Sequence, residues 1–301
     1  MPFLVLILIA SICGVVAGVA AWRYPRRAWE KPAPALSIAE KIGEVAEHHP
    51  AGRSALQRRL KPESATELAL TIALLFSIGA GVILGLLAYL IRTNSHLIGF
   101  DNGVAKWGNR HATAFSTHAL TDVTQLGAIQ NVIVLAVVLA VVELIRDRSR
   151  WLVPFIVAVV GGEELLANVI KGIVDRTRPT FNPAAATLGP SFPSGHTTTA
   201  AAFWACAALL LGRQRSRPAR SILAGAAVAI GVGVACSRVL LDVHWLTDVL
   251  GGLLLGWGWF AVCGIAFGGR VVSFGAAAEV AARAATPPRQ VPRPQPPGPR
   301  R

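Results

Sequence analysis

Charged residues are scarce in this sequence, and cysteines are few and scattered. Of the 301 residues, 15% are charged and 53% are hydrophobic, and the mean hydropathy is +0.53. A soluble domain carries about 25% charged residues, so the composition argues against one. The four cysteines lie singly in apolar runs and lack the spacing of a zinc or redox site. They are interpreted as small buried hydrophobes.

Several short motifs of familiar enzyme classes are also absent. The sequence contains no H-E-x-x-H, no glycine-rich Walker loop, no G-x-S-x-G elbow and no cluster of carboxylates suited to a divalent metal. These absences argue against a zinc protease, a nucleotide-hydrolysing P-loop protein and a serine hydrolase. We therefore expect no metal ion and no cofactor.

Long apolar runs are what the sequence has in abundance. They cover 3–22, 68–91, 128–145, 151–170, 197–212, 221–241 and 245–268. Most reach the roughly 20 residues that cross a bilayer. The run at 197–212 is short and needs the polar turn before it to complete a crossing. The prediction is an all-α polytopic membrane bundle with six core transmembrane helices and an extra N-terminal span.

The net charge of +13 is distributed as a topology signal. Of the 29 basic residues, 22 lie in the segments 23–67, 146–150, 213–220 and 270–301, which the predicted spans place on one side. The positive-inside rule assigns that side to the cytoplasm, with anionic lipids as partners there. Nucleic acid binding is poorly supported. Seven basic residues remain for the opposite side: Arg92, Lys106, Arg110, Lys171, Arg176, Arg178 and Arg238.

The predicted organisation has four parts. Residues 1–22 form a transmembrane span or a signal-like segment; basic residues follow this run rather than precede it, which favours a retained span over a cleaved signal. Residues 23–66 form a basic cytoplasmic amphipathic segment, and 67–268 form the membrane domain. Residues 92–127 are expected to be its longest outside loop. The basic, proline-rich residues 269–301 are expected to form a disordered cytoplasmic tail.

The first polar cluster is "KGIVDRTRP" at 171–179. Seven residues are about two helical turns, so Lys171 and Arg178 are expected to share a helical face, with Pro179 stopping the helix. A pair of interfacial anchors would explain them, but they lie on the side where basic residues are scarce. Two cations there suit a bound phosphate. Arg176 is interpreted as an interfacial anchor, with contact to a second phosphate as the alternative.

The second cluster is "PSGH" at 193–196, immediately before an apolar run. Ser194 and Gly195 would stand where a helix begins, and its free N–H groups form an anion site. Ser194 could instead simply cap the helix. Capping does not explain His196, whose ordinary pKa near 6.5 suits it to donate a proton to a leaving oxygen.

The third cluster is "SRVLLDVHWLTD" at 237–248, between the last two apolar runs. His244 and Asp248 are four residues apart and would lie on one helical face. A carboxylate in this place can fix one imidazole tautomer and leave the other nitrogen free to attack. Together with Arg238, the cluster favours phosphate ester chemistry through a histidine nucleophile.

The three clusters together resemble the type 2 phosphatidate phosphatases, the lipid-phosphatase branch of a superfamily that includes vanadium haloperoxidases. The family pattern, K-x6-RP, PSGH and SR-x5-H-x3-D, is matched at every signature position. The resemblance covers roughly 67–268.

The resemblance implies a role for each matching residue. It implies that His244 is the nucleophile, that Asp248 orients it and that His196 protonates the leaving oxygen and later activates water. The residues that it implies bind phosphate are Lys171, Arg178, Ser194, Gly195 and Arg238. It implies a six-span core, a site facing away from the cytoplasm and no metal.

The expected function is hydrolysis of a lipid phosphate in a bacterial plasma membrane. Undecaprenyl diphosphate, phosphatidate and phosphatidylglycerol phosphate are the expected substrates. A lipid phosphotransferase and a non-enzymatic lipid-anion binder or transporter are the alternatives. The substrate and the oligomeric state cannot be predicted from these residues. Nor can the sequence decide whether Asp242 faces solvent or repels a second negative charge. Glu163 and Glu164 are interpreted as paired within the bundle or partly protonated, with a part in the chemistry as the alternative.

Overall fold

The computed structural model describes residues 2–23, 62–93, 95–146, 149–180, 182, 185, 188–213 and 215–271. These residues form helices without strands, which confirms the predicted all-α class. The helices are α1 (Pro2–Arg23), α4 (Pro62–Thr93), α5 (Ser95–Arg110), α6 (Ala114–Thr124), the short 3-10 helix η2 (Gln125–Gly127), α7 (Ile129–Arg146), α8 (Leu152–Val174), α9 (Gly195–Gly212), α10 (Arg217–Leu240) and α11 (Leu246–Val271). Most of the predicted segment 23–66 and of the tail 269–301 lies outside the described residues.

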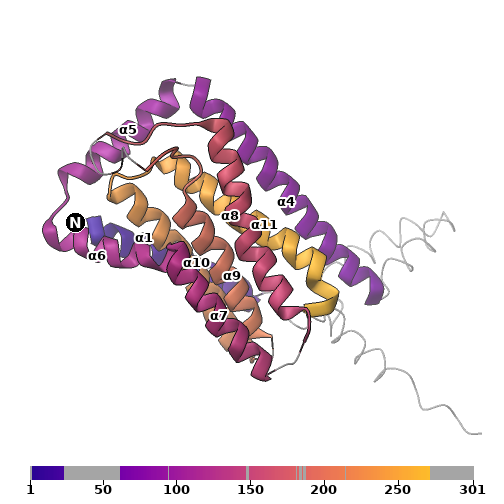
Figure 1. Ribbon diagram of the computed structural model, residues 1–301. Coiled ribbons are helices and arrows are strands. Elements are labelled where there is room, and N and C mark those ends of the chain that lie inside the picture. The colour runs from indigo at the N-terminus through magenta and orange to yellow at the C-terminus, as the bar shows by residue number, and fades with distance from the viewer. Residues whose placement is uncertain are drawn as a thin grey trace, which may run out of the picture. The chain divides into compact units, whose positions relative to one another are not determined.

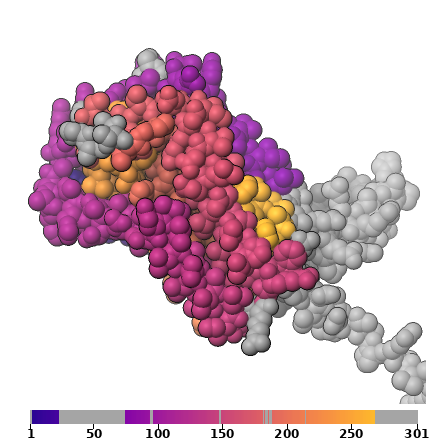
Figure 2. All heavy atoms as spheres, in the orientation of Figure 1, coloured from indigo at the N-terminus to yellow at the C-terminus, as the bar shows by residue number. Residues whose placement is uncertain are grey.

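Within the described residues, six helices are long and apolar enough to cross a membrane: α1, α4, α7, α8, α10 and α11. Large aliphatic side chains on α1, α4 and α7 point outward, as in Val82 and Val137, which are more than half exposed. In water this exposure would be unfavourable, whereas acyl chains solvate it. Figure 2 shows α7 and α8 packed side by side on one such face. The protein is an integral membrane protein.

The remaining predicted span, 197–212, forms α9, which lies at the centre of the bundle (Figure 1). It contacts α7, α8, α10 and α11 and buries most of its residues. The parallel helix α11 comes unusually close, because a Cβ on Gly256 would lie 2.5 Å from the Thr198 carbonyl oxygen. This close packing brings the first turns of α9 and α11 together at one end of the bundle.

The segment 92–127 is not the loop that the sequence predicts, because most of it forms α5, α6 and η2. Helix α5 buries Asp101, Ala105 and Gly108, which lie on one helical face although only one of them is distinctly apolar. Thr113 and Ser116 form a reciprocal capping box that starts α6. Both helices contact α10, and they lie at the end of the bundle where α9 and α11 begin (Figure 1).

Candidate active site

Helix α8 carries Lys171 in its last turn and ends at Val174. Asp175 adopts the left-handed conformation at φ 44°, and its N–H donates to the Lys171 carbonyl oxygen over 3.0 Å. The helix therefore stops before Arg178 and Pro179. The prediction that Lys171 and Arg178 share a helical face was wrong, because a C-terminal cap at Asp175 ends the helix earlier than the proline does. Arg178 reaches the site from the non-helical segment that follows.

Helix α9 begins beside the end of α8. Ser194, fully buried at the N-cap, makes no side-chain capping bond; its Oγ instead accepts a hydrogen bond from Thr197 Oγ1 at 3.1 Å. The simple capping interpretation was therefore wrong, and the Ser194 hydroxyl leaves the first N–H groups of α9 available. Lys171 Nζ lies 3.2 Å from the position that a Cβ on Gly195 would occupy. A cation and a helix N-terminus thus face the same small volume.

The turn between α10 and α11 brings the third cluster to the same place. The Arg238 carbonyl oxygen accepts the N–H groups of Val243 at 3.2 Å and His244 at 3.3 Å, which folds the turn back on α10. The Arg238 guanidinium is buried, and its Nη1 donates to Thr124 Oγ1 at 3.3 Å. The Ser194 N–H donates to the backbone carbonyl oxygen of Asp248 at 3.1 Å, which joins the starts of α9 and α11.

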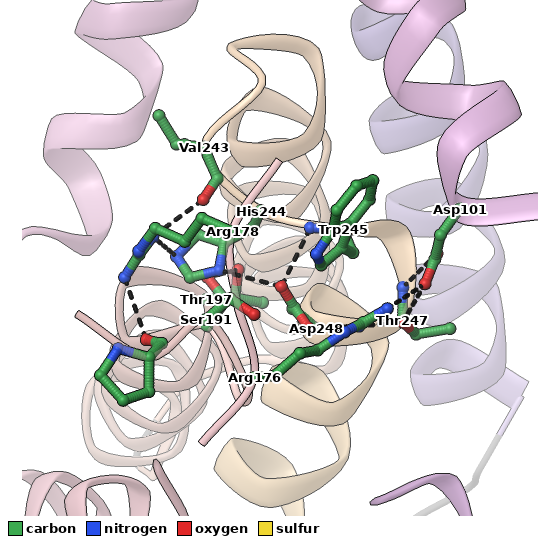
Figure 3. Close-up of polar contacts among 12 residues, drawn as sticks. Asp101, Arg176, Arg178, Ser191, Thr197, Val243, His244, Trp245, Thr247 and Asp248 are labelled. Atoms are coloured by element: carbon green, nitrogen blue, oxygen red, sulfur yellow. Dashed lines mark hydrogen bonds and ion pairs between the residues drawn. The ribbon is translucent and has the colours of Figure 1, made fainter. Parts of the chain in front are cut away.

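His244 is 2% exposed and has a polar partner at each ring nitrogen (Figure 3). Its Nδ1 lies 3.4 Å from Asp248 Oδ2, and its Nε2 lies 3.0 Å from Arg178 Nη1. Because a guanidinium only donates hydrogen bonds, Nε2 must accept, and Nδ1 carries the proton. Burial lowers the pKa of His244 to about 4, against the opposing effect of Asp248. At neutral pH the ring is uncharged, with its lone pair on Nε2.

Arg178 is held mainly by backbone oxygens. Its Nε donates to the Gly189 carbonyl at 2.8 Å, Nη1 to Val243 at 2.8 Å and Nη2 to Pro190 at 3.2 Å. Burial lowers the pKa of the guanidinium, and the negative charge of Asp248 opposes that effect. None of these hydrogen-bond acceptors is a carboxylate, so much of the positive charge remains available to an anion beside His244.

The eight residues predicted for the site gather at this end of the bundle. They are Lys171, Arg178, Ser194, Gly195, His196, Arg238, His244 and Asp248. His196, half-buried in the first turn of α9, is within electrostatic range of His244 and of the cations Lys171, Arg178 and Arg238. The arrangement offers a neutral nucleophilic nitrogen, a second imidazole and several cations around one volume.

Two residues of the site were not found from the sequence. Arg176 is not an interfacial anchor, because it is only 10% exposed and forms two buried ion pairs. Its Nη1 lies 2.6 Å from Asp248 Oδ1, and its Nη2 lies 2.7 Å from Asp101 Oδ2. The available signal for Arg176 was its place in the first cluster, on the side of the membrane where basic residues are scarce. Asp101 had no such signal, because it lies in residues 92–127, which the sequence predicts to be a loop.

Three further acidic residues lie near the predicted clusters. Asp242 is 5% exposed, so the solvent-facing interpretation was wrong. Glu164 Oε1 accepts a hydrogen bond from Asn168 at 3.0 Å, whereas Glu163 is fully buried in α8. Among the residues that the structure describes, no group of three or more His, Cys, Asp or Glu side chains is arranged to hold a metal ion.

Comparison of the chain with known proteins identifies several relatives. The model of the PAP2 superfamily matches residues 151–270. The chain is 32% identical over 176 residues to phosphatidylglycerophosphatase B of Bacillus subtilis (strain 168), covering 57% of this chain and 84% of that protein. It is 35% identical over 135 residues to lipid A 1-phosphatase of Rhizobium etli, covering 39% of this chain and about half (54%) of that relative.

A solved structure is also similar. The crystal structure of a transmembrane PAP2 type phosphatidylglycerolphosphate phosphatase from Bacillus subtilis superposes with a TM-score of 0.59 at 28% identity, covering 62% of this chain and 93% of that one. The similarity thus extends over most of the length of a relative that is itself a transmembrane protein. The chain therefore belongs to the PAP2 superfamily and is a membrane phosphatase.

Proposed function

We propose that this protein hydrolyses the phosphate monoester or diphosphate of a membrane lipid through a phosphohistidine formed on His244. The observation that carries the proposal is the state of the His244 ring. Asp248 faces the protonated Nδ1, and Nε2 presents its lone pair beside the Arg178 guanidinium. A neutral imidazole in this tautomer is the form that can attack phosphorus.

The phosphoryl group would be bound by fixed positive charge. Lys171 and the N-terminus of α9 adjoin each other at Gly195, while Arg178 lies against His244. We propose that a phosphoryl oxygen replaces His244 Nε2 as an acceptor for Arg178, which releases the lone pair for attack. Arg238 would supply a further cation, and Ser194 a hydroxyl. Such preorganised donors stabilise the charge that develops on the pentacoordinate phosphorus.

The proposed reaction has two steps. His244 Nε2 forms a bond to phosphorus, the phosphorus–oxygen bond to the lipid breaks, and His196 gives its proton to the departing oxygen. Burial and the neighbouring cations lower the pKa of His196 to about 3 in the free protein, so this step requires the bound phosphate, whose negative charge offsets the cations, to bring a proton onto the ring. In the second step His196 takes a proton from water as the water oxygen attacks phosphorus. The phosphorus–nitrogen bond then breaks, which returns neutral His244 and releases inorganic phosphate. A phosphotransferase would use a lipid or sugar hydroxyl in place of water.

The substrate belongs to the class of lipid phosphates. The names of the Bacillus subtilis relative and of the similar crystal structure favour phosphatidylglycerol phosphate as the first substrate to test. Phosphatidate and undecaprenyl diphosphate present the same phosphoryl chemistry. The distribution of basic residues favours a site on the extracytoplasmic side of a bacterial plasma membrane and anionic lipids as partners on the cytoplasmic side.

The test is phosphate release by detergent-purified protein from these three lipids, with EDTA present throughout. His244→Ala is the matched variant, and its folding is checked by the thermal transition. We expect release that survives EDTA and is lost in the variant. Quenching with alkali should trap a phosphoenzyme in the wild type only, and acid should destroy it, because a phosphorus–nitrogen bond is stable to base and labile to acid. If the folded wild-type protein releases phosphate from none of these lipids, hydrolysis is wrong, and phosphoryl transfer to added acceptors becomes the reaction to measure.

A further inference from the structure

A buried ion-pair network lies behind Asp248, on the side away from the His244 ring (Figure 3). Arg176 Nη1 donates to Asp248 Oδ1 and to Thr247 Oγ1, both at 2.6 Å, and its Nη2 donates to Asp101 Oδ2 at 2.7 Å. Asp101 also accepts the Thr247 N–H at 3.1 Å and its hydroxyl at 2.5 Å. Both carboxylates are fully buried.

We infer that Arg176 and Asp101 are positioning residues that set the orientation and the charge of Asp248, and through it the reactivity of His244. The inference rests on the proposed function, because it assigns His244 the role of nucleophile. It concerns a contact that the three sequence clusters do not reveal, because Asp101 lies outside all of them. Asp101 lies on α5, and it precedes His244 by 143 residues in the sequence.

The geometry of Asp248 shows why its orientation depends on Arg176. Oδ2 receives two hydrogen bonds, from the Trp245 N–H at 3.0 Å and from His244 Nδ1 at 3.4 Å. Oδ1 is held by Arg176 alone among the described hydrogen bonds. A carboxylate fixed at one oxygen can rotate about its Cβ–Cγ bond, so the Arg176 bond keeps Oδ2 directed at the imidazole. This is the role that an outer partner plays for a histidine–carboxylate pair.

The charges in the network are arranged to favour a positive His244 ring. Asp101 and Asp248 carry one negative charge each and Arg176 one positive charge, so the group is negative by one unit while His244 is neutral. When Nε2 bonds to phosphorus and Nδ1 keeps its proton, the ring becomes positive and the network becomes neutral. Arg176 limits the negative potential at His244, and Asp101 restores part of it.

Other groups also act on His244, and they define what the test must separate. The charged or titratable groups that face it are Asp248 of α11, Arg178 before α9, Arg238 of α10 and His196 of α9. Arg176 and Asp101 act on it from behind Asp248. Substituting either of them changes the electrostatic potential on the Nδ1 side of the ring. The phosphate-binding cations on the Nε2 side are unchanged in the variants proposed below.

The test compares Arg176→Gln and Asp101→Asn in the full-length protein, using phosphate release from the lipid that wild type prefers. Both variants loosen Asp248, so we expect kcat to fall by about 10- to 100-fold with KM within about threefold. Their pH profiles should move in opposite directions. Arg176→Gln leaves two uncompensated carboxylates, which raises the pKa of His244 and shifts the acid limb of kcat/KM to higher pH. Asp101→Asn removes one negative charge and shifts it to lower pH, each by about one unit.

Matched variants separate positioning from folding. Arg176→Lys keeps the charge and should recover the acid limb, although not the full kcat, because a lysine cannot bridge two carboxylates with a planar fork. Arg110→Gln, exposed at the end of α5, removes an equal charge from outside the network and should match wild type. If Arg176→Gln does not fold, the double variant Arg176→Gln/Asp101→Asn removes the ion pair as a unit and should fold with reduced kcat.

The outcomes are distinct from those that bear on the proposed function. If wild type is active, and the folded variants show wild-type kcat or lose activity with unshifted, parallel pH profiles, the positioning inference is wrong and the network is only structural. If wild type itself forms no phosphohistidine, the proposed function fails first. Opposite shifts of the acid limb establish that Arg176 and Asp101 act on His244.

Discussion

Asp242, two residues before His244, is a carboxylate in surroundings that disfavour its charge. It is 5% exposed, its Oδ1 is buried without a hydrogen-bond partner, and burial raises its pKa to about 6. Its backbone adopts the left-handed conformation at φ 55°, which asparagine tolerates at least as well as aspartate. The residue is therefore suboptimal for stability at neutral pH, as residues beside functional sites often are.

We expect Asp242→Asn to stabilise the protein at high pH. Its folded-state pKa lies above the ordinary value of 3.8, so ionisation of Asp242 costs stability as pH rises from about 4 to about 6. A pKa raised from 3.8 to about 6 corresponds to at most about 3 kcal/mol, and asparagine avoids this loss, so we expect Tm to rise by several °C. Tm measured in detergent should be higher for the variant at pH 8, and equal to that of wild type near pH 4. An equal Tm at pH 8 would contradict the expected effect.

The elements that hold the site meet at their ends: α8 ends, and α9 and α11 begin, around the same volume. Two of these ends lie close together, because a Cβ on Gly195 would be 3.2 Å from Lys171 Nζ, closer than an ordinary van der Waals contact. Glycine has a lower helix propensity than alanine, so Gly195 makes the first turn of α9 less stable than alanine would. In return, it leaves space for the lysine and for an anion at the helix N-terminus. The neighbouring Gly172 of α8 is exposed, and a Cβ there would meet nothing within 4 Å.

We expect Gly195→Ala to lower kcat/KM by about tenfold or more, since a 1.4 kcal/mol loss in binding the phosphoryl group has that effect. The new Cβ would contact Lys171 and narrow the approach to the N–H groups of α9. Gly172→Ala is the matched control, one residue from Lys171 and with the same change in helix propensity. Its kinetics should equal those of wild type. Equal kinetics for both variants would show that the lysine moves aside without consequence.

Most of these elements could be predicted from the sequence, and their ends could not. The apolar runs predicted the spans because a bilayer demands long hydrophobic helices. The sequence predicted the end of α8 at Pro179, since proline is a strong stop signal, whereas Asp175 ends it by a backbone conformation that the residue type does not reveal. Helices α5 and α6 were missed because α5 buries Asp101 and Gly108, so its inward face is not apolar.

The site could be predicted to the extent that its residues are adjacent in the sequence. His244 and Asp248 are four residues apart, and a helical start fixes their relation. The contact between Arg176 and Asp101 joins residues 75 apart, one in the segment after α8 and the other in α5, and only the folded chain brings them together. Long-range polar contacts of this kind leave no periodic pattern in the chain.

At the scale of the whole molecule, the bundle separates two kinds of basic residue. Arginines near the ends of α7 and α9 meet around a buried carboxylate, where Glu143 pairs with Arg146 at 2.6 Å and with Arg213 at 2.7 Å. At the other end, the cations of the candidate site surround His244. The first group is consistent with the positive-inside side of the membrane, and the second with the opposite side.

Cysteine labelling in whole cells tests this orientation. His118 of α6 lies at the end that contains the site, and Arg150 lies between α7 and α8 at the other end; both are exposed. With a membrane-impermeant maleimide, we expect His118→Cys to be labelled in intact cells and Arg150→Cys only after permeabilisation. The parent protein controls for the four native cysteines. The reverse pattern would place the site in the cytoplasm.

Helix α5 has a consequence for how the protein can be divided. The family-matched segment, 151–270, contains all eight residues predicted for the site, yet Asp101 lies outside it. That segment is therefore not an exchangeable module. Grafted into a relative whose corresponding helix lacks an acid at this place, it would bury Arg176 with one carboxylate instead of two. Successful chimeras should be joined upstream of α5, so that the protein that supplies His244 and Arg176 also supplies the helix that carries Asp101.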